Sequence, residues 1–129
     1  MSGQYDRTEL LLGAGALRIL RQSRVAVFGL GGVGGYVVEA LARSGIGTLD
    51  LVDNDRISVS NLNRQLLATH RTVGRFKTDA ALERVRDIDP SITVHARSVF
   101  FGPDTAGEFD FSAFDYVVDA IDTVTGKLQ

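Results

Sequence analysis

The stretch VAVFGLGGVG, residues 25–34, decides the fold of this chain. Its apolar half predicts a buried parallel strand over residues 24–28, and its glycines predict a tight turn into a helix over residues 33–44. Gly29 and Gly31 let the backbone turn sharply and approach a ligand, because neither has a Cβ atom. The start of such a helix offers N–H groups and a positive dipole end to a phosphate. A purely structural glycine turn is the alternative.

The composition describes an ordinary globular domain. The chain has 129 residues, 44% of them hydrophobic and 23% charged, with a net charge of −2. These values suit one domain with a buried core and give no global basic character of the kind that marks nucleic-acid binders. The absence of cysteine excludes a disulfide framework, a thiolate zinc site and a cysteine nucleophile within this chain. With no membrane-length apolar run and no signal-peptide pattern, we expect a cytoplasmic protein without an integral membrane segment.

Periodicity and turn residues predict the other elements. An N-terminal helix is expected to break near Gly13 and Gly15, and Gly45 and Gly47 are expected in the left-handed conformation that ends a helix. A further helix opens at Lys77 and stops before Pro90. The later strands are predicted at residues 48–52, 92–96 and 116–122.

This order predicts an α/β fold, a Rossmann-like doubly wound and mainly parallel sheet with helices on both faces. Because such a sheet normally continues, we expect residues 1–129 to be the N-terminal part of a longer nucleotide-binding domain, truncated at its C-terminus. The phenylalanines between residues 100 and 114 are predicted to pack rather than to form a stacking platform.

Two strand tips carry carboxylates. The second strand ends at Asp53, 19 residues after Gly34, where a dinucleotide-binding fold places an acid on the ribose hydroxyls. The alternative is an ordinary turn carboxylate. Asp122, at the tip of the last strand, should face the same crevice and either hold Mg²⁺ on a triphosphate or cap the next helix. The long polar stretch 54–75 should lie beside the phosphate turn, with His70 a plain loop histidine.

Motifs over nearly the whole chain resemble the adenylating superfamily that includes the ubiquitin-activating enzymes and the bacterial ThiF, MoeB and HesA proteins. The Asn-x-x-Arg-Gln element followed twelve residues later by a lysine is not a dehydrogenase feature. The resemblance therefore implies ATP rather than NAD. The motifs are YDR at 5–7, the glycine turn at 29–34, DND at 53–55, SNLNRQ at 60–65, VGRFK at 73–77 and DAID at 119–122.

The resemblance implies that an oxygen of a carboxylate or carbonyl attacks the α-phosphate of ATP, with Mg²⁺ as a second cofactor. Catalytic roles would fall to Arg64, Lys77 and Arg7, the last reaching the γ-phosphate in the partner subunit of a homodimer. Asp53 would bind the ribose and Asp122 the metal. Fixed positive charge suits nucleotidyl transfer, which depends on positioning and on stabilising phosphate charge. The residues that would contact the nucleotide are Gly29, Gly31, Gly32, Gly34, Asp53, Asp55, Asn61, Arg64, Gln65, Lys77 and Asp122.

The glycine turn together with EALARSGIG at 39–47 most resembles the branch whose members dehydrate threonylcarbamoyladenosine in tRNA. The resemblance implies adenylation of that nucleoside's carboxylate, followed by cyclisation that expels AMP. The slightly negative net charge does not indicate a tRNA-binding surface. A basic surface is therefore expected from residues beyond this part of the protein or from the dimer.

Three alternatives stay open. The first is adenylation of the C-terminal Gly-Gly of a ubiquitin-like sulfur carrier, with sulfur-transfer proteins as further partners. The others are a non-catalytic nucleotide-binding or dimerisation module and a nicotinamide dehydrogenase. For residues 1–129 alone we expect little or no catalysis.

Overall fold

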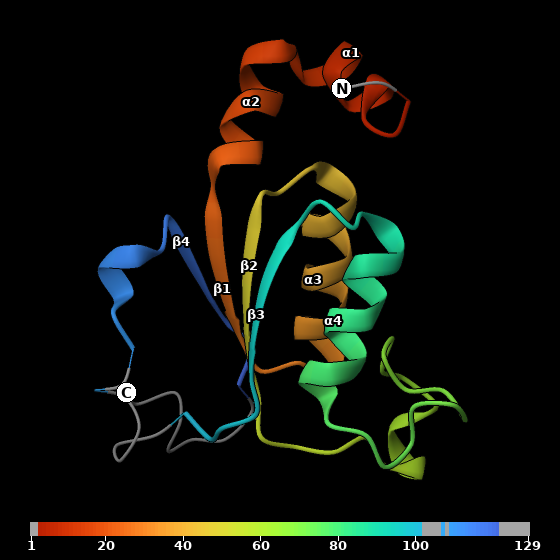
Figure 1. Ribbon diagram of the computed structural model, residues 1–129. Helices are drawn as coiled ribbons and strands as arrows, with labels where there is room; N and C mark the ends of the chain where they lie inside the picture. The colour runs from red at the N-terminus through yellow and green to blue at the C-terminus, as the bar shows by residue number, and fades with distance from the viewer. Residues whose placement is uncertain (1–2, 102–106, 108, 122–129) are drawn as a thin grey trace.

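A computed structural model describes residues 3–101, 107 and 109–121 of the chain (Figure 1). Strands and helices alternate after two N-terminal helices, as the glycine turn predicts. The elements in chain order are α1 (Asp6–Leu12), α2 (Ala14–Gln22), β1 (Arg24–Phe28), α3 (Gly32–Ser44), β2 (Thr48–Val52), the 3-10 helix η1 (Val59–Asn61), α4 (Lys77–Ile88), β3 (Thr93–Arg97), the 3-10 helix η3 (Phe111–Ala113) and β4 (Tyr116–Asp119).

The four strands run parallel in one sheet of order β3-β2-β1-β4. The connection from β1 to β2 runs through α3, and the connection from β2 to β3 runs through α4, so both move the chain towards the β3 edge of the sheet. Right-handed connections that run in the same direction place their helices on the same face of the sheet. The next strand, β4, pairs with the other side of β1. The direction of winding therefore reverses between β1 and β4, and open α/β sheets bind ligands at such a reversal, outside the carboxyl ends of the strands. The predicted doubly wound parallel sheet is confirmed.

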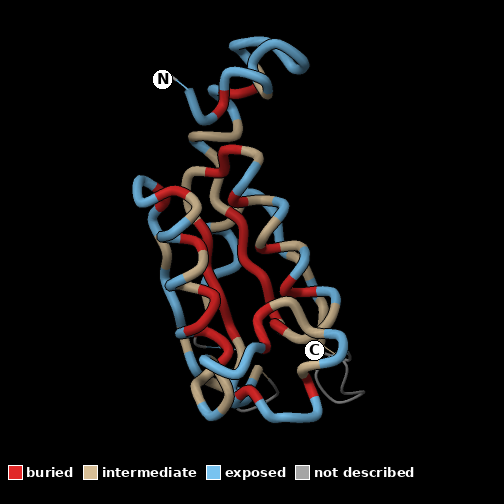
Figure 2. Tube along the Cα trace, turned by 90° about the vertical axis from the view of Figure 1, so that its right-hand side faces the viewer, coloured by how far each residue is buried: buried red, intermediate tan, exposed pale blue. Residues whose placement is uncertain are grey.

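Alternating side chains of the strands build two different cores. Val27, Leu49 and Leu51 pack with α3 and α4, whereas Ala26 and Phe28 point to the opposite face. Figure 2 shows the buried residues running through the strands and along the sheet-facing sides of the helices. The two α-helices that pack on the described sheet thus share one face, and the prediction of helices on both faces is represented on the other face by the 3-10 helix η3 (Figure 1).

An aromatic cluster covers the opposite face of the sheet, where η3 also lies. The ring of Phe28 lies 4.6 Å from that of Phe101 and 5.3 Å from that of Phe109, between centroids. Phe111 and Phe114 complete the cluster, with their rings 6.3 Å apart. These residues pack against the strands as predicted.

The glycines near the helix ends are required for different reasons, a positive φ at some positions and close backbone contact at another. The N-terminal helix breaks at Gly13 (φ +88°), whereas Gly15 lies within α2. Gly45 ends α3 in the left-handed conformation (φ +97°), as predicted. The prediction for Gly47 is wrong, because its φ is not positive. Gly47 is needed for close approach instead, since a Cβ atom there would lie 1.9 Å from the carbonyl oxygen of Arg21.

A buried polar network holds the N-terminal segment against the body of the protein. The hydroxyl of Tyr5 donates to Oδ2 of Asp89 at 2.6 Å, and Nη1 of Arg21 donates to the same oxygen at 3.0 Å. Burial, reinforced by the Asp89 carboxylate, raises the pKa of Tyr5. Burial alone would raise the pKa of Asp89, but hydrogen bonds from Ser91, Tyr5 and Arg21 outweigh it and lower the pKa to about 2.

Candidate functional site

The turn between β1 and α3 is built from glycines because the chain is crowded there. Gly29 has φ +92°, and a Cβ atom on it would lie 2.7 Å from the carbonyl oxygen of Ala120. A Cβ atom on Gly34 would lie 1.7 Å from the carbonyl oxygen of Gly29. The first turn of α3 therefore packs directly on the end of β1, as predicted for Gly34.

The start of α3 faces open space rather than protein. A Cβ atom on Gly32 would meet nothing within 4 Å among the described residues. The residue before the helix, Gly31, supplies no side-chain cap to the first turn. The first N–H groups of a helix have no partner within the helix, and the dipole adds partial positive charge there. An anion such as a phosphate group fits this end of α3.

Asp53 is held rigidly at the tip of β2. Its Oδ2 accepts the N–H of Leu30 at 2.7 Å, and its Oδ1 accepts the N–H of Asp55 at 2.7 Å. Each carboxylate oxygen has a second acceptor site. The half-buried carboxylate is thus oriented by the glycine turn itself and can still accept hydroxyl groups of a ligand.

The long segment after β2 is a closed loop with ordered ends. Arg56 and Phe76 form an antiparallel bridge, the N–H of Ile57 donates to the carbonyl oxygen of Arg75 at 2.8 Å, and the N–H of Lys77 donates to that of Asp55 at 3.0 Å. These bonds return the chain to its starting point. The loop therefore lies beside the glycine turn, as predicted, and sets Asp55 next to Lys77.

Lys77 is a buried cation at the first position of α4. The residue is 6% exposed, and its Nζ lies 3.9 Å from Oδ2 of Asp55, a mostly exposed carboxylate. A positive charge at a helix N-terminus is opposed by the helix dipole, and its burial costs free energy unless an anion compensates it. The position of Lys77 is therefore suited to an anionic ligand.

The side chain of Gln65 places a hydrogen-bond acceptor, its Oε1 atom, in the same site as Lys77 and the glycine turn. Its Oε1 is buried and has no hydrogen-bond partner among the described residues, and its side-chain amide approaches Gly31. Buried side-chain polar atoms are seldom left unpaired, so a ligand is expected here. Asn61 holds the turn that presents Gln65, because its carbonyl oxygen accepts the N–H of Gln65 at 3.0 Å while its Oδ1 accepts the N–H of Ser58 at 2.9 Å.

These groups meet in a cavity of about 180 Å³ at the reversal point of the sheet. Its polar wall consists of the glycine turn, residues 53–55 after β2, the side-chain amide of Gln65 and the ammonium group of Lys77. Its other wall is apolar and comes from the ends of β3 and β4. The lining residues are Gly29, Gly31, Val52, Asp53, Asn54, Asp55, Gln65, Lys77, Val99, Phe100, Phe101, Ala120 and Ile121.

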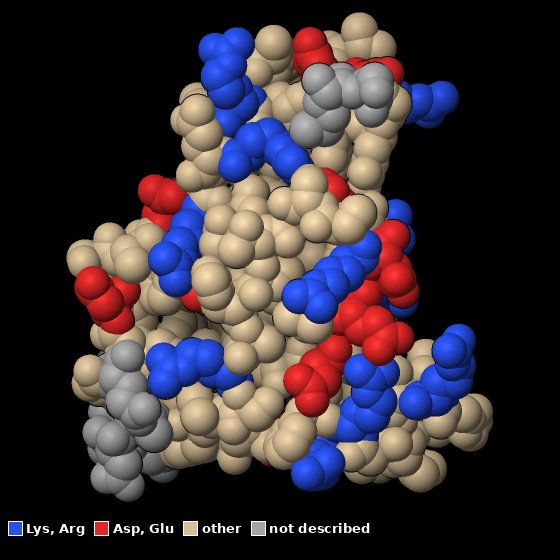
Figure 3. Space-filling model, in the orientation of Figure 1, with Lys and Arg blue, Asp and Glu red and all other residues tan. Residues whose placement is uncertain are grey.

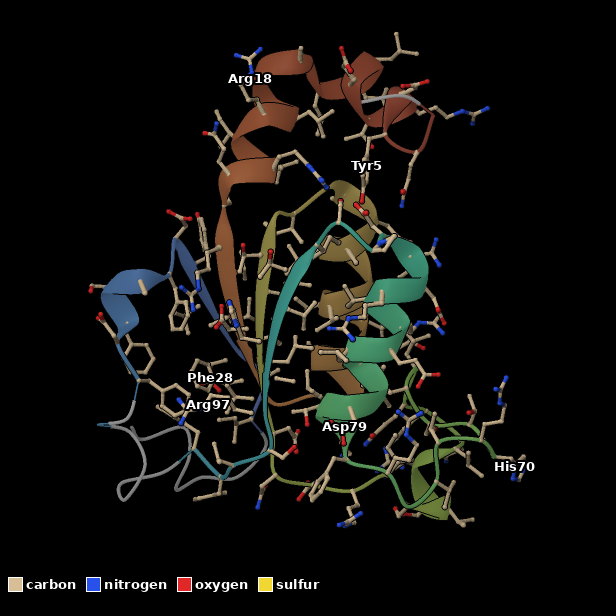
Figure 4. The ribbon with its side chains drawn as sticks, in the orientation of Figure 1. Tyr5, Arg18, Phe28, His70, Asp79 and Arg97 are labelled. Atoms are coloured by element: carbon tan, nitrogen blue, oxygen red, sulfur yellow. The ribbon has the colours of Figure 1, made fainter. Side chains whose placement is uncertain are left out.

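Other predicted site residues lie outside this lining. Arg64 is exposed, and its Nη1 donates to the carbonyl oxygen of Ser60 at 2.9 Å. Arg7 is exposed on α1, at the end of the molecule opposite the glycine turn (Figure 1). Asp122, the predicted metal ligand, lies outside the described residues. His70 is exposed on the loop and points away from the body of the protein (Figure 4).

Two properties of the described residues bear on metals and membranes. No three His, Cys, Asp or Glu side chains of that part gather in a group that would hold a metal ion. Its helices are all too short or too polar to cross a bilayer.

The apolar wall of the cavity is the part that the sequence did not predict. Val99 and Phe100 follow β3, and Ile121 follows β4, so all three reach the crevice from strand ends. Phe100 is 41% exposed and lines the cavity, which the packing role predicted for the phenylalanines did not include. Its position directly after a strand was the available signal, because strand ends in this fold face the crevice.

Comparison with known proteins places the chain in a family. The model of the ThiF family matches residues 5–129. A tRNA threonylcarbamoyladenosine dehydratase of Bacillus subtilis is 44% identical over 129 residues, which are 100% of this chain and 51% of the relative. An adenylyltransferase and sulfurtransferase uba4 of Aspergillus clavatus is 41% identical over 80% of this chain and 21% of its own length.

The solved structures agree with the sequence relatives. The crystal structure of E. coli tRNA N6-threonylcarbamoyladenosine dehydratase in complex with ATP matches with a TM-score of 0.93 and 39% identity, over 96% of this chain and 51% of that one. The chain spans about half the length of these dehydratases. With the family model covering nearly all of its residues, the chain belongs to the ThiF family.

Proposed function

We propose that this chain is the ATP-binding part of an enzyme that adenylates the carboxylate of threonylcarbamoyladenosine in tRNA. The observation that carries the proposal is the convergence, in one crevice, of an uncapped helix N-terminus, the buried Lys77 ammonium group and the unpartnered Oε1 of Gln65. The printed names of the dehydratase relatives, and the ATP bound in the E. coli structure, support the choice of nucleotide and substrate.

Each residue of the crevice has a role in this proposal. The backbone at Gly31 and Gly32 receives the phosphates, and Asp53 accepts the ribose hydroxyls. Lys77 balances phosphate charge, and the wall with Phe100 and neighbouring apolar residues takes the base. A carboxylate oxygen of the substrate forms a bond to the α-phosphorus while the bond to the bridging oxygen of pyrophosphate breaks. Positive charge in fixed positions stabilises the leaving group.

Residues outside the cavity belong to the proposal as well. Arg64 and Asn61 would contact the triphosphate from the loop. Asp122 would hold Mg²⁺, which would offset part of the negative charge of the phosphates. The enzyme would be a homodimer in which Arg7 of one subunit reaches the γ-phosphate of the other, since α1, the helix that carries Arg7, lies at the end of its own subunit opposite the glycine turn (Figure 1).

A second candidate is adenylation of a ubiquitin-like sulfur carrier, with sulfur-transfer proteins as partners. The uba4 relatives, 41% identical in one case, favour this alternative. ATP–pyrophosphate exchange distinguishes the two in the full-length protein. Exchange driven by tRNA that bears threonylcarbamoyladenosine supports the first candidate, whereas exchange driven by a Gly-Gly-ended carrier alone supports the second.

The substitution Lys77→Met tests the site itself. It removes the charge and keeps most of the buried volume, so ATP should bind about 10- to 100-fold more weakly. Without ATP, the variant should be as stable as the wild type or more so, because the buried charge that is removed has only a long contact, 3.9 Å, with the mostly exposed carboxylate of Asp55. Calorimetric titration with ATP and thermal unfolding measure the two effects.

Arg86→Met is the matched control, since Arg86 is an exposed cation on the same helix. This variant should bind ATP as the wild type does. Equal ATP affinity of Lys77→Met and the wild type would contradict the proposed role of Lys77.

A further inference from the structure

The loop beside the cavity carries a local excess of positive charge that the composition conceals. Residues 56–76, which we call the basic loop, contain four arginines and no aspartate or glutamate. The net charge of −2 for the whole chain therefore leaves −6 on the remaining residues. The arginines are Arg56, Arg64, Arg71 and Arg75.

Three of these arginines keep their charge available. Arg56 donates to the carbonyl oxygen of Gly74 at 2.9 Å, and Arg64 donates to the neutral oxygens of Ser60 and Asn63. Arg71 is exposed on the loop. Among the residues that the structure describes, none of the three pairs with a carboxylate. Their positive charge therefore faces solvent. Arg64 is assigned to the triphosphate of ATP in the proposed function, which leaves Arg56 and Arg71 for a second anionic partner.

Acidic residues of α4 border the basic loop on one side. Arg75 pairs with Glu83 at 2.9 Å, and Asp79 and Asp87 lie on the same helix. Figure 3 shows Lys or Arg side chains over the loop at the lower right, next to this acidic strip. An anionic partner would thus lie along the loop and away from α4.

We infer that the basic loop is the docking surface for the phosphate backbone of RNA, an inference that rests on the proposed function. The loop begins beside Asp55 and ends at Lys77, and both residues line the cavity. An RNA strand bound along the loop therefore places one of its nucleotides at the mouth of the cavity, where ATP is proposed to bind.

The chemistry of the loop favours RNA over a protein partner. Protein interfaces depend on buried aromatic and apolar anchors, yet Val59 is the one large apolar side chain that is strongly exposed among the described residues of the loop. The loop offers guanidinium, hydroxyl and amide donors instead, which suit phosphate and ribose oxygens. The guanidinium group of Arg56 also stacks on the ring of Phe76 at 4.0 Å, which holds it in place.

The experiment measures binding of labelled tRNA to the full-length protein at several salt concentrations. The first variant is Arg71→Glu, and its control is Arg18→Glu, an exposed arginine at the opposite end of the molecule (Figure 4). Arg71→Glu should weaken tRNA binding about tenfold or more, with Arg18→Glu unchanged. The double variant Arg56→Gln/Arg71→Gln should also reduce the slope of log affinity against log salt by about 1–2.

ATP binding, measured separately by calorimetry, should be unchanged in all of these variants. If the wild-type protein does not bind ATP, the proposed function fails, whatever the RNA result. If ATP binds but tRNA binds equally to Arg71→Glu, to the double variant and to the wild type, the docking surface alone is wrong. Loss of affinity for a Gly-Gly-ended carrier, with tRNA binding intact, would assign the loop to a protein partner instead.

Discussion

At the scale of single residues, Gly32 and Gly34 show how two glycines of one motif are required for different reasons. A Cβ atom on Gly34 would lie 1.7 Å from the carbonyl oxygen of Gly29, whereas one on Gly32 would meet nothing within 4 Å among the described residues. The first glycine of the pair borders open space, where the phosphates are proposed to bind. The second leaves room for the protein's own backbone.

The variants Gly34→Ala and Gly32→Ala should separate these roles. Gly34→Ala forces the turn and α3 apart and should lower the free energy of unfolding by ~3 kcal/mol. Gly32→Ala should change that free energy by less than ~1 kcal/mol, because alanine suits a helix, yet weaken ATP binding. Urea unfolding and ATP titration measure the two effects. Equal stability of the two variants would refute the distinction.

At the scale of elements, a few buried side chains and a polar network attach the N-terminal helices. No residue of α1 is buried, and Leu17 is the buried residue of α2. The hydrogen bonds that Tyr5 and Arg21 donate to Asp89 therefore hold both helices against the end of α4. Because α1 follows Tyr5 directly, the same network helps to fix the position of the helix that carries Arg7.

Asp89→Asn should show the strength of this attachment through its pH dependence. The pKa of Asp89 is lowered to about 2 from an unfolded value of 3.8, so at pH 3 the unfolded chain binds more protons than the folded one. The stabilisation, ~2 kcal/mol, is complete above about pH 5 and is lost progressively as the pH falls through 3.8 to below 2. The difference in unfolding free energy between the wild type and the variant should shrink over this range.

Asp87→Asn, two residues away and exposed, is the control and should show no comparable pH-dependent difference from the wild type. A constant difference between the wild type and Asp89→Asn from pH 5 to pH 2.5, a range set by those two pKa values, would contradict the assignment.

At the scale of the whole molecule, the sheet separates the two ends at which function is proposed. The crevice lies at the carboxyl ends of the strands, whereas α1 and Arg7 lie beyond their amino ends (Figure 1). A single subunit of this shape does not bring Arg7 to its own crevice. The proposed homodimer resolves this separation by completing each site with an arginine from the other subunit.

Mixed dimers test this arrangement. Full-length Arg7→Ala and Lys77→Met proteins should each be inactive, but a mixed dimer contains one site with both residues intact. An equal mixture should recover about a quarter of wild-type turnover, because half of the dimers are mixed and each has one working site of two. Mixed dimers that form and stay inactive would show that Arg7 does not act across the interface.

Short-range sequence patterns were enough to predict most of the local structure and the family. Residues 24–28 and 48–52 form β1 and β2 with the predicted bounds, because their apolar patterns suit strands buried in a parallel sheet. The glycine turn, the start of α4 at Lys77 and the resemblance to the ThiF family followed from short-range motifs, which fix backbone conformation within a few residues.

Which side chains come into contact depends on how distant segments pack together, and the sequence patterns did not predict it. Gly47 is required by the backbone of Arg21, far along the chain, and not by its own φ. Phe100 and Phe101 both line the cavity, and Phe101 also packs against Phe28. Such contacts join segments distant in sequence, and their geometry depends on the order of strands in the sheet and on the closure of the loop between Arg56 and Phe76. Local periodicity contains no information on either.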